Sequence, residues 1–336
     1  MKRNAVFIIV LLMILTGGCK KAENITEGYS SPGEWKLVRQ AQTNGHFGGL
    51  SFADPYNGWA VGDSGRILHT NDGGNSWRVQ ESGTTVPLKC VHFATAQLGW
   101  IGGAGDSIGK TTDGGVSWTW QHPAGESRRT FMAVSFANEF AGWIVDNYGG
   151  ILHTEDGGIT WTSQTSGTQW AITSVQFLDA KEGWATATNR VVLHTTNGGN
   201  NWSTLTLDTL SYGSGVTVTY TDIFFFTRSK GWIATNAGAS SIANPVASVV
   251  YTLDTGKTWI VQPSPETIII NSIKFLDENA GWAASEGGIL HTSNGGGKWT
   301  YELNIAGGIF VDIWFVDRSH GWAITVSGNI YRYQAL

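Results

Sequence analysis

Residues 58–77 read GWAVGDSGRILHTNDGGNSW, and this stretch returns along the chain with the same glycine and tryptophan positions. Its opening Gly-Trp pair occurs seven times, beginning at Gly58, Gly99, Gly142, Gly183, Gly231, Gly281 and Gly321. The usual spacing of about 41 residues is that of an internal repeat. The sequence therefore predicts one repeat architecture and not a series of unrelated domains.

An alternating apolar run precedes each Gly-Trp pair. FGGLSFAD (47–54) and LKCVHFAT (88–95) are two examples. A period of two, bounded by Gly, Asn and Asp, predicts short β-strands, so we expect each repeat to be a four-stranded meander. Because such a unit cannot bury its faces alone, neighbouring units must stack around an axis. The sequence predicts an all-β, seven-bladed β-propeller over residues 33–336.

The two ends of the repeat region complement each other. The last repeat, GWAITVSGNIYRYQAL (321–336), stops before its glycine-rich hairpin and closing Trp strand. EWKLVRQ (34–40) has the form of that missing strand. We therefore expect residues 34–40 to close the last blade.

Most aromatic and histidine side chains follow the repeat and are expected to be structural. Of the 17 tryptophans, seven belong to the Gly-Trp pairs and seven to the closing strands, which leaves Trp120, Trp170 and Trp314. One repeat column holds four histidines but accepts Lys or Tyr in other repeats, and it consists of His69, His153, His194, His291, Lys110, Tyr251 and Tyr331. This variation argues against a metal site, and we expect neither a metal nor a cofactor.

The hairpins of the form T-x-D-G-G-x-S/T-W, such as Thr70 to Trp77, resemble the Asp-box of bacterial neuraminidase (BNR) repeats. Their acidic or amide positions are Asp72, Asp113, Asp156, Asn197, Asp254 and Asn294. Such side chains accept hydrogen bonds from the backbone of their own turn, and Asn can replace Asp in that role. We expect these residues to be structural.

Taken together, the Gly-Trp opening, the G-x-ILHT strand and the Asp-box hairpin resemble the photosystem II stability/assembly factor family of seven-bladed propellers. That resemblance implies a non-catalytic chaperone of a membrane-complex subunit, with a basic patch that binds the partner. Outside the N-terminal region, this chain has only Arg128-Arg129 as a basic pair.

Residues that the repeat does not explain are the candidates for partner binding. Strand order places the loops between blades on one rim, and six partner-binding candidates belong there: Trp120, His122, Arg128, Arg129, Trp170 and Tyr212. Exposed aromatic and polar side chains suit recognition of a protein or a glycan. The alternative is that these rings pack beneath longer loops.

Catalysis is the less favoured hypothesis. Asp222 and Asp312 share a column of the innermost strands and are the best pair of carboxylates for a carbohydrate-binding or glycoside-hydrolase-like site in the central channel. Small or hydrated residues around a water-filled channel are the favoured explanation of that column. No arginine triad of a sialidase is visible, and a net charge of −5 without a basic run argues against nucleic acid. We expect a binding module and not an enzyme.

The N-terminus predicts export and a membrane anchor. A basic start (Met1-Lys2-Arg3), an apolar run (5–15) and small residues before Cys19 form a secretory signal over residues 1–18. Cys19 resembles the lipidated cysteine of a bacterial lipobox, so residues 19–32 would be a tether. The bacterial cell envelope is the expected location, at the outer membrane and facing the periplasm or the cell surface. Plain secretion is the alternative.

Overall fold

The computed structural model describes residues 33–41, 45–123, 128–207, 218–237, 249–262 and 269–335. The predicted signal peptide, Cys19 and tether lie outside the described residues, as does Tyr212. No helix among the described segments has the length and apolar character needed to cross a membrane.

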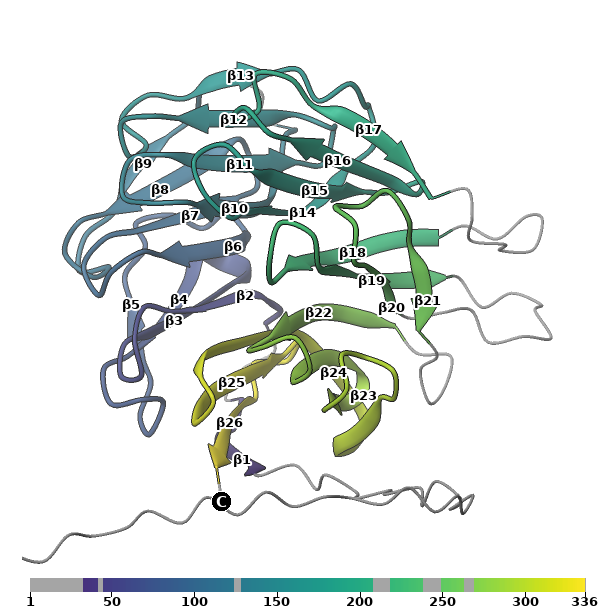
Figure 1. Ribbon diagram of the computed structural model, residues 1–336. Helices are drawn as coiled ribbons and strands as arrows, with labels where there is room; N and C mark the ends of the chain where they lie inside the picture. Colours follow the sequence, from purple (N-terminus) through teal and green to yellow (C-terminus); the bar gives the residue numbers. More distant parts are fainter. Residues whose placement is uncertain are drawn as a thin grey trace, which may run out of the picture. The chain divides into compact units, whose positions relative to one another are not determined.

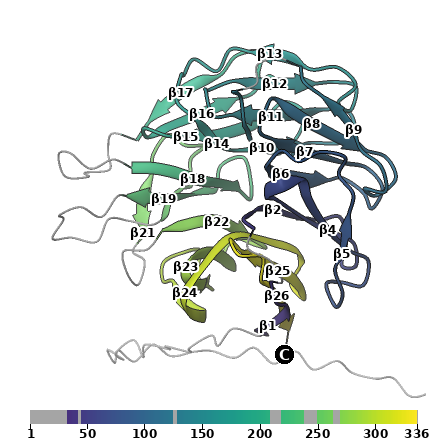
Figure 2. The same cartoon turned by 180° about the vertical axis from the view of Figure 1, so that it is seen from behind.

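Five four-stranded antiparallel sheets follow one another in chain order (Figures 1 and 2). The first contains β2 (Phe47–Phe52), β3 (Gly58–Gly62), β4 (Arg66–Thr70) and β5 (Arg78–Gln80), with a short 3-10 turn η1 (Asp63–Gly65) between β3 and β4. The second contains β6 (Leu88–Phe93), β7 (Gly99–Gly103), β8 (Ser107–Thr111) and β9 (Thr119–Gln121). The third contains β10 (Phe131–Phe136), β11 (Gly142–Asp146), β12 (Ile151–Thr154) and β13 (Thr162–Gln164). The fourth contains β14 (Ile172–Phe177), β15 (Gly183–Ala187), β16 (Val191–Thr195) and β17 (Ser203–Thr206). The fifth contains β18 (Val218–Phe225), β19 (Gly231–Ala237), β20 (Val249–Thr252) and β21 (Ile260–Gln262).

The remaining strands form one six-stranded sheet with the order β1-β26-β25-β24-β23-β22. Its members are β1 (Gly33–Arg39), β22 (Ile270–Phe275), β23 (Gly281–Thr292), β24 (Thr300–Asp317), β25 (His320–Thr325) and β26 (Ile330–Ala335). The first strand of each repeat contacts that of the next, from β2 through β6, β10, β14, β18 and β22 to β24 and back to β2. The described part of the chain is thus an all-β propeller with its innermost strands around one axis.

The prediction of seven blades is wrong, because the described residues form six. The sixth and seventh repeats share the six-stranded sheet, since β24 pairs with β23 through its first part and with β25 through its last. In the first and third blades, the outer strand is followed by a turn in which a serine hydroxyl accepts a backbone hydrogen bond. Ser82 accepts the N–H of Thr84, and Ser166 accepts that of Thr168. Asn304 stands at the equivalent distance after its Trp, and the strand continues through it, because β24 runs from Thr300 to Asp317 and pairs first with β23 and then with β25.

The N-terminal strand closes the last sheet, as the sequence predicts. β1 pairs antiparallel with β26, and Trp35 lies opposite Tyr333. Residues from the two ends of the described chain therefore complete one sheet.

The Gly-Trp pairs build the contacts between blades. A Cβ atom on Gly58 would lie 2.3 Å from the Phe52 ring, so only glycine fits beside that ring. The next residue, Trp59, stacks on Phe93 of the following blade, with ring centroids 3.4 Å apart. Its indole Nε1 donates a hydrogen bond to the Gly114 carbonyl in the Asp-box of that blade, at 3.1 Å. The same stacking occurs in Trp100–Phe136, Trp143–Phe177, Trp184–Phe225, Trp232–Phe275 and Trp322–Phe52.

Two rims result from this strand order. We call top rim the loops that precede the innermost strands together with the turns that join the second and third strands of each repeat. We call bottom rim the turns between the first and second strands, such as residues 53–57, together with the Asp-box hairpins, such as residues 71–77.

Candidate functional site

On the top rim, hydrogen bonds connect loops of the second and third blades into one surface. The backbone N–H of Asp106 donates to the Arg129 carbonyl at 3.0 Å. Thr130 and Asn147 form two hydrogen bonds with each other. The Thr130 N–H donates to Asn147 Oδ1, and the Asn147 N–H donates to the Thr130 carbonyl. The loops around residues 105, 129 and 147 are therefore fixed relative to one another.

The predicted arginine pair has two different environments. Arg129 lies with Nη1 2.9 Å from Oδ2 of the buried Asp146, and its Nε is 3.9 Å from Oδ1 of the buried Asp106. Arg128 next to it is exposed. Arg129 thus braces the loops, and Arg128 presents its charge to solvent.

Among the described residues of the top rim, the most exposed Trp and Tyr side chains come from the loop between the third and fourth blades and from a turn of the third blade. Trp170 is 51% exposed and Tyr148 is 56% exposed. The Ser166 hydroxyl donates to the Gly149 carbonyl at 2.6 Å, which ties the two loops together. The sequence pattern points to Trp170 but not to Tyr148, although an aromatic residue at the tip of a glycine-containing turn is a visible signal.

Two further predicted residues lie near this surface. Trp120 is half-buried on β9, and its indole Nε1 donates to the Ser82 carbonyl at 2.7 Å, so its polar atom already has a partner within the fold. His122 is exposed, with Nδ1 3.2 Å from the Gly105 carbonyl oxygen. Of the predicted residues that the structure describes, Arg128, Trp170 and His122 present side chains to solvent on this rim.

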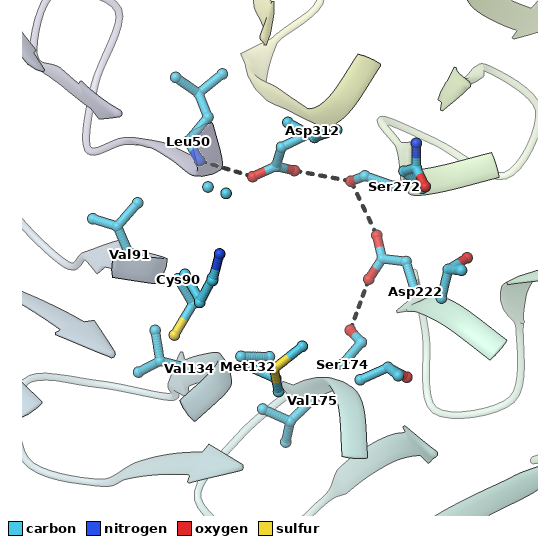
Figure 3. A pocket seen from close by; sticks show the side chains of 18 of the residues that line it. Leu50, Cys90, Val91, Met132, Val134, Ser174, Val175, Asp222, Ser272 and Asp312 are labelled. Atoms are coloured by element: carbon cyan, nitrogen blue, oxygen red, sulfur yellow. Dashed lines mark hydrogen bonds between the residues drawn. The ribbon is translucent and has the colours of Figure 1, made fainter. Parts of the chain in front are cut away.

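The central channel brings together Asp222 and Asp312, the two aspartates of the less favoured catalytic hypothesis. Figure 3 shows Asp222 and Asp312 on the channel wall with Ser272 between them. The Ser272 hydroxyl lies 2.9 Å from Asp312 Oδ1 and 3.1 Å from Asp222 Oδ2, and the Ser174 hydroxyl lies 2.7 Å from Asp222 Oδ1. A cavity of about 170 Å³ is lined by these residues together with Lys89, Cys90 and Met132.

Backbone contacts show what these carboxylates do in the fold. Asp312 Oδ2 accepts the N–H of Leu50 at 2.8 Å, and Asp222 Oδ2 accepts that of Ile273 at 2.9 Å. Each aspartate therefore joins its own innermost strand to the innermost strand of the next repeat. Ser51 makes the equivalent contact at another joint by accepting the Phe93 N–H. The two aspartates therefore have a structural role, since each connects neighbouring innermost strands by a hydrogen bond.

The electrostatics of the channel wall distinguish Asp312. Desolvation raises the pKa of Asp312 to about 6, although Lys274 and the Leu50 N–H favour its ionised form. Lys274 Nζ lies 3.7 Å from Asp222 Oδ2 and faces the rings of Phe224 and Trp314. On the same wall, burial raises the pKa of the Cys90 thiol to about 12, so this cysteine stays protonated and packed.

The Asp-box side chains lie within their own turns on the bottom rim. Asp113 Oδ1 accepts the N–H of Ser117 at 2.9 Å and the Thr111 hydroxyl at 2.8 Å, while Oδ2 accepts the Ser117 hydroxyl at 2.6 Å. The bonds from Ser117 and Thr111 lower the pKa of Asp113 to about 2. Equivalent bonds from the threonine hydroxyl that precedes the turn reach Asp72, Asp156, Asn197, Asp254 and Asn294.

The histidine column packs against the tryptophans of the Gly-Trp pairs. His69 and His153 each stack on the indole of their own blade at 4.7 Å. Burial is the main cause that lowers the pKa of both imidazoles. Among the described residues, no three His, Cys, Asp or Glu side chains gather where they could hold a metal ion.

Comparison with known protein families identifies the family of this chain. A model of the family described as photosynthesis system II assembly factor YCF48 matches residues 29–122, 79–166 and 119–240, and these overlapping matches cover more than half of the 336 residues. The chain belongs to this family. The resemblance inferred from the repeats is thereby confirmed. Among curated protein sequences, none matches the chain.

Solved structures of YCF48 share the fold of this family member. A structure described as YCF48 bound to D1 peptide is 20% identical, with a TM-score of 0.72 over 91% of this chain and 97% of that one. YCF48 from Cyanidioschyzon merolae is 20% identical, with a TM-score of 0.69 over 90% and 98%. An inactive virginiamycin B lyase from Staphylococcus aureus with quinupristin is 13% identical, with a TM-score of 0.71 over 90% and 100%. The propeller fold is thus shared by a YCF48 and by a lyase, so the fold alone does not fix the activity.

Proposed function

We propose that this YCF48 family member is a non-catalytic assembly factor that binds a protein partner through its top rim and is held at a bacterial membrane by a lipid on Cys19. The observation that carries the proposal is the exposure of Trp170 and Tyr148 on two loops that are tied together. Large aromatic side chains on a rigid support are the usual centres of protein interfaces. Arg128 adds a positive charge on the same rim.

Family membership supports a protein as the partner. One YCF48 structure is described as bound to D1 peptide, so a member of this family takes a polypeptide ligand. This chain has a single arginine pair on its top rim, and Arg129 of that pair is committed to Asp146. We infer that aromatic contacts contribute more here than a basic patch does.

The channel contacts support a binding role over catalysis. All four carboxylate oxygens of Asp222 and Asp312 accept hydrogen bonds from serine hydroxyls or backbone N–H groups. A general acid or base must exchange its proton with a substrate, whereas these groups hold neighbouring strands together.

The proposed export and anchor come from the N-terminal sequence, in which small residues precede Cys19 after an apolar run. A lipid on Cys19 would keep the protein in the cell envelope, at the outer membrane and facing the periplasm or the cell surface. Mass spectrometry of the N-terminal peptide from the membrane fraction tests this directly, and an unmodified Cys19 would contradict it.

The test of the binding surface compares two variants with the unmodified chain. Partners are captured by the full chain from detergent-solubilised envelopes and identified, and the affinity of the purified partner is then measured. We expect Trp170→Ala with Tyr148→Ala to weaken binding by about tenfold or more, since interface aromatics are the usual hot spots. Val79→Ala is the matched control, because Val79 is exposed and apolar but lies on the outer strand β5. Undiminished affinity in the double variant would contradict the assignment of the top rim.

A further inference from the structure

The described chain begins on the bottom rim. Gly33 pairs with Ala335, two residues beyond Tyr333, which itself lies opposite Gly321. In the first blade the residue opposite the equivalent glycine, Gly58, is Thr70, where the Asp-box starts. Gly33 is therefore on the same rim as the Asp-box hairpins. Cys19 precedes Gly33 by 14 residues, and a fully extended chain of that length reaches at most about 50 Å.

Exposed apolar side chains occupy the tips of the turns on this same rim. Tyr56 and Phe140 lie between the first and second strands of their blades, and Val116, Ile159 and Leu253 lie in Asp-box hairpins. All five are between 57% and 78% exposed. Each of these side chains therefore leaves more than half of its surface outside the core, and a set of exposed apolar groups on one face is typical of an interaction surface. Their placement on four blades suits a broad flat surface better than a pocket.

The charges on the bottom rim indicate which kind of partner surface can lie against it. Asp113 is exposed and Asp156 is partly exposed between these apolar tips, and hydrogen bonds from the adjacent Ser117 and Thr160 favour their ionised form. Negative charges disfavour a strongly anionic surface. A zwitterionic lipid surface accepts apolar side chains at its headgroup boundary without that repulsion.

We propose that the bottom rim lies on a lipid bilayer, with Tyr56, Val116, Phe140, Ile159 and Leu253 in the headgroup region. This inference rests on the proposed anchor at Cys19, which would hold that rim within reach of the membrane. It also gives the proposed binding function an orientation, because Trp170 and Tyr148 then face away from the lipid.

The experiment places one environment-sensitive fluorophore on each rim of the full chain in zwitterionic phosphatidylcholine nanodiscs. Val116→Cys carries the label on the bottom rim and Trp170→Cys carries it on the top rim. Spin-labelled lipid is the quencher. We expect quenching and a blue shift at position 116 and neither at position 170, and we expect anionic lipid to reduce the quenching.

A matched pair of triple variants tests whether the apolar tips cause the contact. Tyr56, Phe140 and Ile159 changed to Ser should abolish the quenching at position 116. Val79, Ile260 and Val261 changed to Ser should leave it intact, because these side chains are also exposed but lie on the outer strands β5 and β21.

Three results would overturn the proposal. The first is equal quenching on both rims, and the second is quenching that survives the bottom-rim triple variant. The third is a blue shift at position 116 that needs no lipid and grows with protein concentration, which would make a second copy of the chain the occupant. If Cys19 carries no acyl chain, the anchor fails separately. The same labels are then read on chains held to nickel-chelating lipid by a histidine tag ahead of residue 20.

Discussion

The joint between the first two blades differs from the seam, which is the seventh repeat (β24, β25 and β26) closed by β1. In both places a tryptophan Nε1 donates a hydrogen bond, but the acceptors differ. At the ordinary joint, Trp59 Nε1 donates to the Gly114 carbonyl of the next Asp-box. At the seam, the last repeat carries no Asp-box, and Trp282 Nε1 donates instead to Glu302 Oε2 at 2.7 Å. Trp35 of β1 donates to the same oxygen at 2.8 Å.

The difference shows how the ring of repeats is completed where the last repeat has no Asp-box hairpin. A backbone carbonyl is neutral and comes with the turn, whereas the Glu302 carboxylate must be desolvated, and burial raises the pKa of Glu302. One carboxylate oxygen satisfies two indole donors that would otherwise be unpaired. We infer that the seam depends on a few side chains, while the ordinary joints depend on the repeated turn.

The largest expected effect comes from removing the seam tryptophan. Trp35→Ala deletes a buried ring that packs edge-on against Phe315 at 5.7 Å and also removes a bond to Glu302. We expect a loss of about 3–5 kcal/mol in the free energy of unfolding, measured by urea denaturation. Trp77→Ala is the control, because Trp77 holds the same repeat position but is only half-buried, and among the described residues its Nε1 has no partner. Equal losses would show that the seam is no more sensitive than an ordinary blade.

Two substitutions of Glu302 distinguish its role as a hydrogen-bond acceptor from the effect of its negative charge. Glu302→Ala leaves the indoles of Trp35 and Trp282 without their acceptor, and we expect a loss of about 2–3 kcal/mol in the free energy of unfolding. Glu302→Gln keeps an acceptor oxygen and removes the buried charge, so its loss should be clearly smaller. Glu81→Ala, on the exposed surface, should leave the urea midpoint unchanged. If the Gln variant is as unstable as the Ala variant, the charge itself is needed at the seam.

The seam also shows which features can be predicted from sequence. The N-terminal closing strand could be predicted because Trp35 repeats a local pattern, and local patterns fix strand type and pairing. The number of blades could not, since it depends on whether β24 continues from its pairing with β23 into its pairing with β25, and a repeat pattern does not encode that continuity.

The same limit applies to the candidate site. Trp170 stands out because it departs from the repeat, and its exposure agrees with that signal. Arg129 departs from the repeat equally, yet it lies against Asp146 on the neighbouring strand β11 and near Asp106 of the preceding blade. The partners of a charged side chain are set by tertiary contacts that a repeat pattern does not encode.

The smallest expected effect is a pH dependence with opposite sign at the seam and in an Asp-box. Asp312 clamps the last innermost strand to Leu50 of the first, and desolvation raises its pKa from 3.8 to about 6. As pH rises from 4 to 6, the unfolded chain loses the Asp312 proton before the folded chain does, so the stability contributed by this group falls. Asp312→Asn should remove that decline.

Asp113 provides the matched control, because hydrogen bonds from Ser117 and Thr111 lower its pKa from 3.8 to about 2. Its contribution is present above pH 3.8 and is lost as pH falls toward 2, so the Asp113→Asn variant should lack a rise with pH in that lower window. Urea denaturation at closely spaced pH values measures both differences against the unmodified chain. Parallel curves for the two variants would mean that Asp312 is hydrated and ionised like a surface carboxylate. The clamp between the last and first innermost strands would then be an ordinary exposed hydrogen bond, and the seam would rest on Trp35 and Glu302 alone.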